Sequence, residues 1–123
     1  MLPYLTVYFG NPSSSHFYGK LTKEAVETSR KQVASLLGCE PEEVVFTSGG
    51  TESNNWAIKG AAFANESKGK HIITTTVEHP AVTEVLKYLE TKGFKTTYVD
   101  VDHTGKVILE QLKQAITPDT ILI

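Results

Sequence analysis

The chain has 123 residues, of which 40% are hydrophobic and 21% charged, the balance of an ordinary folded domain rather than of a disordered or fibrous chain. Its net charge of −2, with no cluster of lysine or arginine, argues against nucleic acid and against an anionic membrane surface as partners. No apolar run approaches the roughly 20 residues of a membrane-spanning helix, and the first residues do not resemble a signal peptide.

The first half of the chain predicts a loop, a long helix and a short strand. Residues 10–15 combine several turn formers with no apolar periodicity, which indicates a loop. Apolar residues recur at helical spacing over residues 21–37, and Gly38 follows where a C-terminal cap belongs, so an amphipathic helix is predicted there. The β-branched and aromatic run at 44–46 stops at two glycines and predicts a short buried strand.

The second half predicts strands that alternate with helices. Residues 51–64 favour a helix with Trp56, Gly60 and Phe63 on one face. Three further strands are predicted at residues 71–75, 96–99 and 120–123. The helices between them carry apolar stripes from Val82 to Leu89 and from Leu109 to Ile116. This alternation predicts an α/β fold whose sheet is mostly parallel, with right-handed helical crossovers.

The turn that follows the first predicted strand has an unusual composition. Residues 47–53, Thr-Ser-Gly-Gly-Thr-Glu-Ser, place two glycines and several hydroxyls at the start of a helix. Glycines allow a ligand to approach the backbone, and the unpaired first amides of a helix favour an anion. Spacing alone leaves two interpretations open, a phosphate site or an ordinary turn capped by Ser48 or Thr51. The turn matches neither the Walker A nor the dinucleotide-binding pattern.

His79 follows the next strand and comes directly before Pro80, a favourable first helical residue. Ligands of parallel sheets bind beyond the carboxyl ends of the strands, so the imidazole is expected to face the same crevice as the glycine turn. A histidine at a helix start is also common as a surface or capping residue, and Glu78 could be a helix N-terminal charge. Lys59, the lysine nearest to the glycine turn, is interpreted as part of a solvated face.

Three motifs, in this order and spacing, resemble the cysteine desulfurase and selenocysteine lyase branch of the class V aminotransferase family. They are Phe-Gly-Asn-Pro-Ser-Ser at 9–14, Val-Phe-Thr-Ser-Gly-Gly-Thr-Glu-Ser-Asn-Asn at 45–55 and Glu-His-Pro-Ala-Val at 78–82. The likeness runs along the whole chain. It implies a fold-type I enzyme that uses pyridoxal 5'-phosphate (PLP), with residues 1–123 as a single, incomplete PLP-binding large domain.

The resemblance implies roles for three residues that match the family motifs. Gly50 and Thr51 would hold the PLP phosphate through backbone amides and the threonine hydroxyl. His79 would stack on the pyridine ring and help proton transfer, which makes it the catalytic candidate, and no metal is implied. Cys39, the only cysteine, matches no catalytic position and is expected to be structural. His16, His71 and His103 receive no role.

The implied activity removes sulfur from L-cysteine, giving L-alanine and an enzyme persulfide, for iron–sulfur cluster assembly or other sulfur delivery. Selenocysteine lyase and a non-catalytic phosphate-binding or split-protein module remain alternatives. Family members carry the cofactor-binding lysine, the persulfide cysteine and the substrate-binding arginine in later residues, so this chain alone is expected to be inactive. The resemblance implies that the complete protein is a homodimer that works with a sulfur-acceptor protein. The single cysteine excludes an internal disulfide and, with no signal-peptide pattern, favours a cytoplasmic location. Strand 120–123 is expected to leave an edge that favours association.

Overall fold

The structure is a computed structural model that describes every residue from Met1 to Ile123. In chain order its elements are α1 (Leu2–Thr6), α2 (Phe17–Leu37), η1 (Pro41–Glu43), α3 (Gly50–Ala64), β1 (His71–Thr75), α4 (Pro80–Glu90), β2 (Lys95–Val99), α5 (Leu109–Ala115) and β3 (Thr120–Leu122). The chain divides into two compact units, Met1–Phe46 and Thr47–Ile123. The single large domain stays a prediction.

The long helix α2 dominates the first unit. It begins at Phe17 rather than at the predicted Leu21, because His16 caps it: the His16 Nδ1 accepts a hydrogen bond from the Gly19 amide at 3.3 Å. It ends at Gly38, whose φ of 71° is the left-handed conformation that favours glycine, so the predicted C-terminal cap is confirmed. The predicted loop at 10–15 contains only turns and irregular backbone.

The predicted strand at residues 44–46 is wrong for this structure. Val44 has extended backbone, with φ −95° and ψ 121°, but no strand of the chain pairs with it. Its carbonyl instead accepts a hydrogen bond from the guanidinium of Arg30, which also lies 5.0 Å from the centre of the Phe46 ring. A strand needs a neighbour in a hydrogen-bonded ladder, which local β propensity cannot supply.

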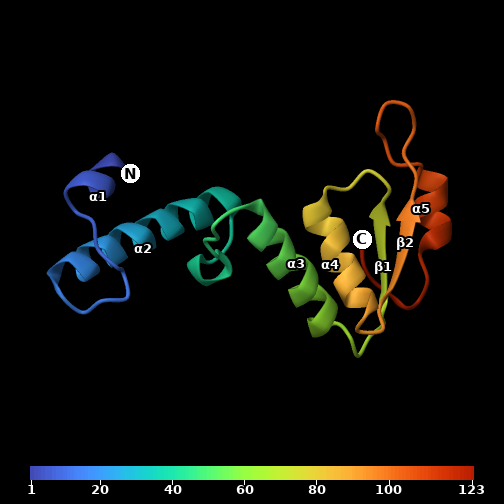
Figure 1. The fold of residues 1–123 in the computed structure, drawn as a ribbon, viewed down its shortest axis with the longest axis horizontal. Helices are drawn as coiled ribbons and strands as arrows, with labels where there is room; N and C mark the ends of the chain where they lie inside the picture. The colour runs from blue at the N-terminus through green and yellow to red at the C-terminus, as the bar shows by residue number, and fades with distance from the viewer. The chain divides into compact units, whose positions relative to one another are not determined.

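The second unit is built on a three-stranded sheet in the order β2-β1-β3. Both pairings are parallel: β1 runs in continuous register with β2, whereas its pairing with β3 shifts between His71 and Ile72. Figure 1 shows α4 and α5 on opposite sides of this sheet. The α/β fold and the parallel sheet are thereby confirmed, and β3 lies at an edge as expected.

The core of the second unit lies between the sheet and the helices α3 and α4. Its buried residues come from both helices, from β1 and from the turn before β2, and they are Ala62, Ile72, Val85, Leu86, Leu89 and Phe94. The apolar stripe predicted for α4 is confirmed. The face predicted for α3 is wrong in part, since Trp56 is 58% exposed while Ile58 and Ala62 pack on the core. A small residue at 62 allows α3 to lie close to its neighbours, which the apolar count alone does not reveal.

The buried His71 joins the strands of the sheet. Its Nδ1 lies 2.8 Å from the Thr120 hydroxyl of β3, and its Nε2 lies 2.8 Å from the Thr97 hydroxyl of β2. Both ring nitrogens therefore have partners, which a buried polar side chain requires. We interpret His71 as a structural residue. None of the helices is long and apolar enough to cross a membrane.

Candidate active site between α3 and α4

The N-terminus of α3 has no side-chain cap. Gly49 is its N-cap residue, so neither Ser48 nor Thr51 has the capping role that the ordinary-turn interpretation gave them. The first amide with an acceptor is that of Ser53, which donates to the Gly49 carbonyl at 3.1 Å. The amides of residues 50–52 find no acceptor within the chain. They form a cluster of free donors at the positive end of the helix dipole.

The glycine turn is held by side chains around it. Oε2 of Glu52 accepts hydrogen bonds from the Ser48 amide and the Ser48 hydroxyl, both at 2.7 Å. These two bonds lower the pKa of the Glu52 carboxyl, the backbone bond having the larger effect. The hydroxyls of Thr47 and Ser53 lie 2.7 Å apart, and the Ser53 hydroxyl donates to the Gly49 carbonyl at 3.2 Å. These hydrogen bonds therefore hold the backbone of the glycine turn in place.

The two glycines of this turn leave open space. A Cβ built on Gly49 or on Gly50 would meet no atom within 4 Å, and neither glycine has the left-handed φ that disfavours other residues. Nothing within the chain therefore requires glycine at these positions. The space beside the free amides is available to a ligand that approaches the backbone closely.

His79 forms the N-terminal cap of α4. Its Nδ1 accepts a hydrogen bond from the Ala81 amide at 3.0 Å, and Pro80 occupies the first turn, where its missing N–H leaves no donor unpaired. The capping interpretation is thus confirmed for His79. Because Nδ1 is an acceptor, the hydrogen of the neutral ring belongs on Nε2, which has no partner within the chain. The ring keeps one nitrogen for other chemistry.

One cavity brings the two turns together. It has a volume of about 350 Å³ and lies between α3 and α4. Its lining residues are Thr51, Asn55, Lys59, His79, Pro80, Ala81, Glu84 and Val85. The expectation that the imidazole and the glycine turn face one crevice is confirmed for the Thr51 end of the turn. Gly50 precedes Thr51 at the start of the helix and does not line the cavity itself.

Sequence reasoning missed three polar residues of this cavity, Asn55, Lys59 and Glu84. Lys59 was expected on a solvated face, but it is half-buried, with its Nζ 4.6 Å from the centre of the Tyr88 ring. The Asn55 side-chain amide donates to the Thr51 carbonyl at 3.0 Å. Residues 51, 55 and 59 are spaced by four, so they share one face of a helix. That spacing, followed from the glycine turn, could have found Asn55 and Lys59, whereas Glu84 comes from α4.

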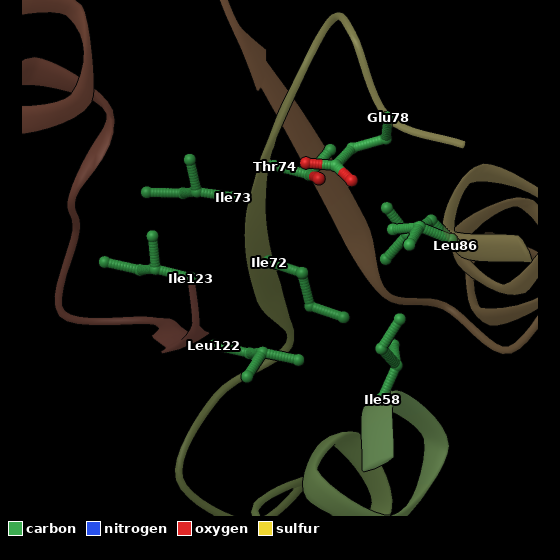
Figure 2. A pocket seen from close by; sticks show the side chains of 9 residues that line it. Ile58, Ile72, Ile73, Thr74, Glu78, Leu86, Leu122 and Ile123 are labelled. Carbon is green, nitrogen blue, oxygen red and sulfur yellow. The ribbon is translucent and has the colours of Figure 1, made fainter. Parts of the chain in front are cut away.

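Glu78 belongs to a second, separate cavity. Its Oε1 accepts a hydrogen bond from the Thr75 hydroxyl at 2.8 Å, so it closes the turn after β1 rather than serving as a charge within the first turn of α4. Figure 2 shows its carboxylate beside Thr74, at one end of a space between Ile72 and the side chains of Ile58 and Leu86. This cavity has a volume of about 210 Å³ and an otherwise largely aliphatic lining. It offers no cluster of donors.

The donors at the start of α3 suit a phosphate. A phosphate has several acceptor oxygens and a negative charge, and here it would meet the free amides of residues 50–52. The hydroxyl of Thr51 also has no partner within the chain and lines the adjacent cavity. A helix N-terminus of this kind favours an anion by its dipole as well as by its donors.

The sequence model of the aminotransferase class-V family matches residues 1–123. This chain belongs to that family. Among curated relatives, cysteine desulfurase IscS of Methanosarcina thermophila is 56% identical over 123 residues, which are 100% of this chain and 30% of the relative. Cysteine desulfurase IscS of Dictyoglomus turgidum is 54% identical over all of this chain and 31% of its own length. The chain therefore spans about a third of the curated relatives it matches.

Solved structures of family members agree with the fold. A NifS-like protein has a TM-score of 0.85 and 44% identity, over 97% of this chain and 33% of its own. DndA of Streptomyces lividans has a TM-score of 0.82 and 41% identity, over 97% of this chain and 34% of its own. SspA, solved in complex with cysteine, has a TM-score of 0.81 and 38% identity, over 96% of this chain and 34% of its own. These relatives confirm the desulfurase branch that the motifs indicated and do not favour the selenocysteine lyase alternative.

Proposed function

We propose that this chain supplies the phosphate-binding and ring-contacting part of a PLP-dependent cysteine desulfurase. The observation that carries the proposal is the cavity between α3 and α4, where Thr51 at an uncapped helix N-terminus faces the same space as His79. The names of the curated relatives support the reaction, in which L-cysteine loses its sulfur and leaves as L-alanine. A related protein solved in complex with cysteine supports the substrate.

The residues of the glycine turn would hold the cofactor by its phosphate. The amides of residues 50–52, which begin with that of Gly50, would donate to the phosphate oxygens, together with the hydroxyl of Thr51. When bound, PLP withdraws electrons from the α-carbon of an amino-acid substrate. The chain's contribution would be to bind the cofactor by its phosphate and to orient it.

His79 would serve as both a ring contact and a proton carrier. The hydrogen bond from Ala81 occupies Nδ1 and fixes the ring at the start of α4, so proton exchange is confined to Nε2. A ring held in this way does not need to reorient before it acts, which favours catalysis by a positioned group.

Other parts of the activity would come from residues beyond these 123. By the family resemblance they are the cofactor-binding lysine, the substrate-binding arginine and the cysteine that receives the sulfur. We also propose a homodimer, a sulfur-acceptor protein, a role in iron–sulfur cluster assembly and a cytoplasmic location. Size-exclusion chromatography, affinity capture and cell fractionation of a protein that contains this chain would test these four points separately.

A pair of vitamin B6 probes tests the phosphate site. Pyridoxine 5'-phosphate lacks the reactive aldehyde of PLP, so it reports binding without random reaction with surface lysines, and pyridoxine is the matched control without phosphate. In ¹⁵N NMR titrations of the chain, we expect pyridoxine 5'-phosphate to shift the amides of residues 50–52 and pyridoxine to leave them unmoved. Unmoved amides with both probes would contradict the proposal.

A separate assay tests the reaction. A protein of the relatives' length that contains this chain should form alanine and sulfide from L-cysteine when PLP and a thiol reductant are present. The 123-residue chain alone should form neither. Phosphate binding without alanine formation by the longer protein would instead favour a non-catalytic module.

A further inference from the structure

The carboxylate of Glu52 bridges back over the glycine turn to Ser48. A single oxygen, Oε2, accepts from both the amide and the hydroxyl of Ser48 at 2.7 Å. In an ordinary capping box a third-position glutamate bonds the amide of the N-cap residue, which here is Gly49. Glu52 reaches one residue further, so it encloses both glycines and leaves the amides of residues 50–52 uncovered.

This contact restrains the most flexible part of the site. Two successive glycines give a turn a large conformational freedom, which has to be lost when a ligand binds. The other side-chain contacts of the turn join the Thr47 and Ser53 hydroxyls to each other and to the Gly49 carbonyl, and none of them reaches Ser48. Glu52 is therefore the side chain that ties Ser48, the residue directly before the two glycines, to the helix.

The charge of Glu52 has an opposite effect. Its carboxylate lies in the first turn of the helix, near the positive end of the helix dipole. An anion bound at this end would be repelled by the negative charge of the carboxylate. Hydrogen bonds from Ser48 lower the pKa of this carboxyl, so the charge persists at neutral pH. The geometry and the charge of Glu52 thus act on phosphate affinity in opposite directions and can be separated by substitution.

We propose that Glu52 is a positioning residue for the phosphate site: by holding Ser48 it keeps the glycine turn open and its amides convergent before the ligand arrives. This inference rests on the proposed phosphate-binding function. A glutamine at position 52 keeps an oxygen that can accept from Ser48 and removes only the repulsion of the phosphate. An alanine removes the repulsion and the acceptor oxygen together. The two substitutions should therefore differ in the direction of their effect.

The test measures affinity for pyridoxine 5'-phosphate by ¹⁵N NMR in wild type and variants. We expect Glu52→Ala to weaken binding by about five- to tenfold, the size of a lost cap or charge-assisted hydrogen bond. Glu52→Gln should bind at least as tightly as wild type, and this rescue is an effect that a merely structural loss would not give. Glu110→Ala, which removes a first-turn glutamate of α5 far along the chain, is the matched control and should bind as wild type does.

The outcomes separate this inference from the proposed function. Binding by wild type with equal affinity in Glu52→Ala, or with Glu52→Gln as weak as Glu52→Ala, would overturn the positioning role alone. No response of the wild-type amides would overturn the phosphate site and this inference with it. Should Glu52→Ala fail to fold, Ser48→Ala removes only one of the two donors and should weaken binding by about two- to threefold. Wild-type affinity in Ser48→Ala would then decide against the proposal.

Discussion

The helices α3 and α4 lie in the same unit and line the same cavity, yet the first backbone amides of the two helices are hydrogen-bonded differently. In α4 the chain itself provides the N-terminal cap, because the His79 side chain accepts a hydrogen bond from the Ala81 amide and Pro80 has no N–H that needs an acceptor. α3 begins at an N-cap glycine with no side-chain bond and leaves its first amides free. Self-capping favours helix stability, whereas free donors favour an external anion. Of the two ends, the uncapped start of α3 is therefore the one that we propose as the phosphate site.

The largest expected effect is on the rate of alanine formation, and it separates the role of His79 as the cap of α4 from its proposed role as a proton carrier. In a longer protein that contains this chain, His79→Ala and His79→Asn should both lower the rate of alanine formation by at least about a hundredfold, because each removes the Nε2 proton carrier. Cofactor occupancy, followed by absorbance, should fall much less than the rate. A proportional loss of occupancy and rate would mean that His79 only binds the cofactor.

The same two variants should differ in stability. Asparagine keeps a side-chain oxygen that can cap α4, so His79→Asn should unfold at nearly the wild-type denaturant concentration, whereas His79→Ala should lose about 1 kcal/mol. Urea unfolding followed by circular dichroism measures this difference. Equal stability of the two variants would show that the Ala81 bond contributes nothing to the helix.

A second substitution converts the start of α3 into a self-capped end. Gly49→Asp places a carboxylate at the N-cap position, where the added Cβ meets no atom within 4 Å. We expect helix stability to rise by only about 0.3 kcal/mol, because glycine is itself a tolerated N-cap residue. Affinity for pyridoxine 5'-phosphate should fall on the order of a hundredfold, because the new carboxylate takes the amides and repels the phosphate. Undiminished affinity would place the phosphate elsewhere.

Removal of the free hydroxyl gives a smaller effect. Thr51→Val keeps the β-branched shape and loses one donor to the phosphate, so we expect affinity to fall by about tenfold. Retention of the cofactor after dialysis, compared between variant and wild type by absorbance, is an independent measure. Thr83→Val on α4 provides a control for the substitution itself, since Thr83 does not line the cavity. Retention unchanged in Thr51→Val would remove that hydroxyl from the site.

The smallest effect concerns pH. The folded-state pKa of Glu52 is lowered by the Ser48 bonds, so its ionised form is favoured in the folded chain. Its contribution to stability is complete above the ordinary glutamate pKa of about 4.3 and is lost as pH falls through the lowered folded value. Glu52→Gln should therefore lose less stability than wild type over that acidic interval. Parallel pH dependences in urea unfolding would contradict the assignment.

Local signals predicted much of the fold and part of the site. The periodicity of Val85, Leu86 and Leu89 placed α4, and Gly38 placed the end of α2, because helical spacing and left-handed caps depend on neighbours in sequence. The motif that contains Thr51 and the position of His79 were also apparent, and their family is confirmed. The assignment of PLP to these residues stays a proposal.

The sequence by itself predicted the helices α2 to α5 and a mostly parallel sheet, since these follow from residues close along the chain. It left the glycine turn open between an anion site and an ordinary capped turn. Tertiary structure alone decided that residues 44–46 find no strand partner, that Ile58 and Ala62 rather than Trp56 pack on the core, and that Lys59 lines the cavity beside Thr51 and His79. Strand pairing, burial and cavity lining depend on which distant surface arrives opposite a residue, and no local preference encodes that surface.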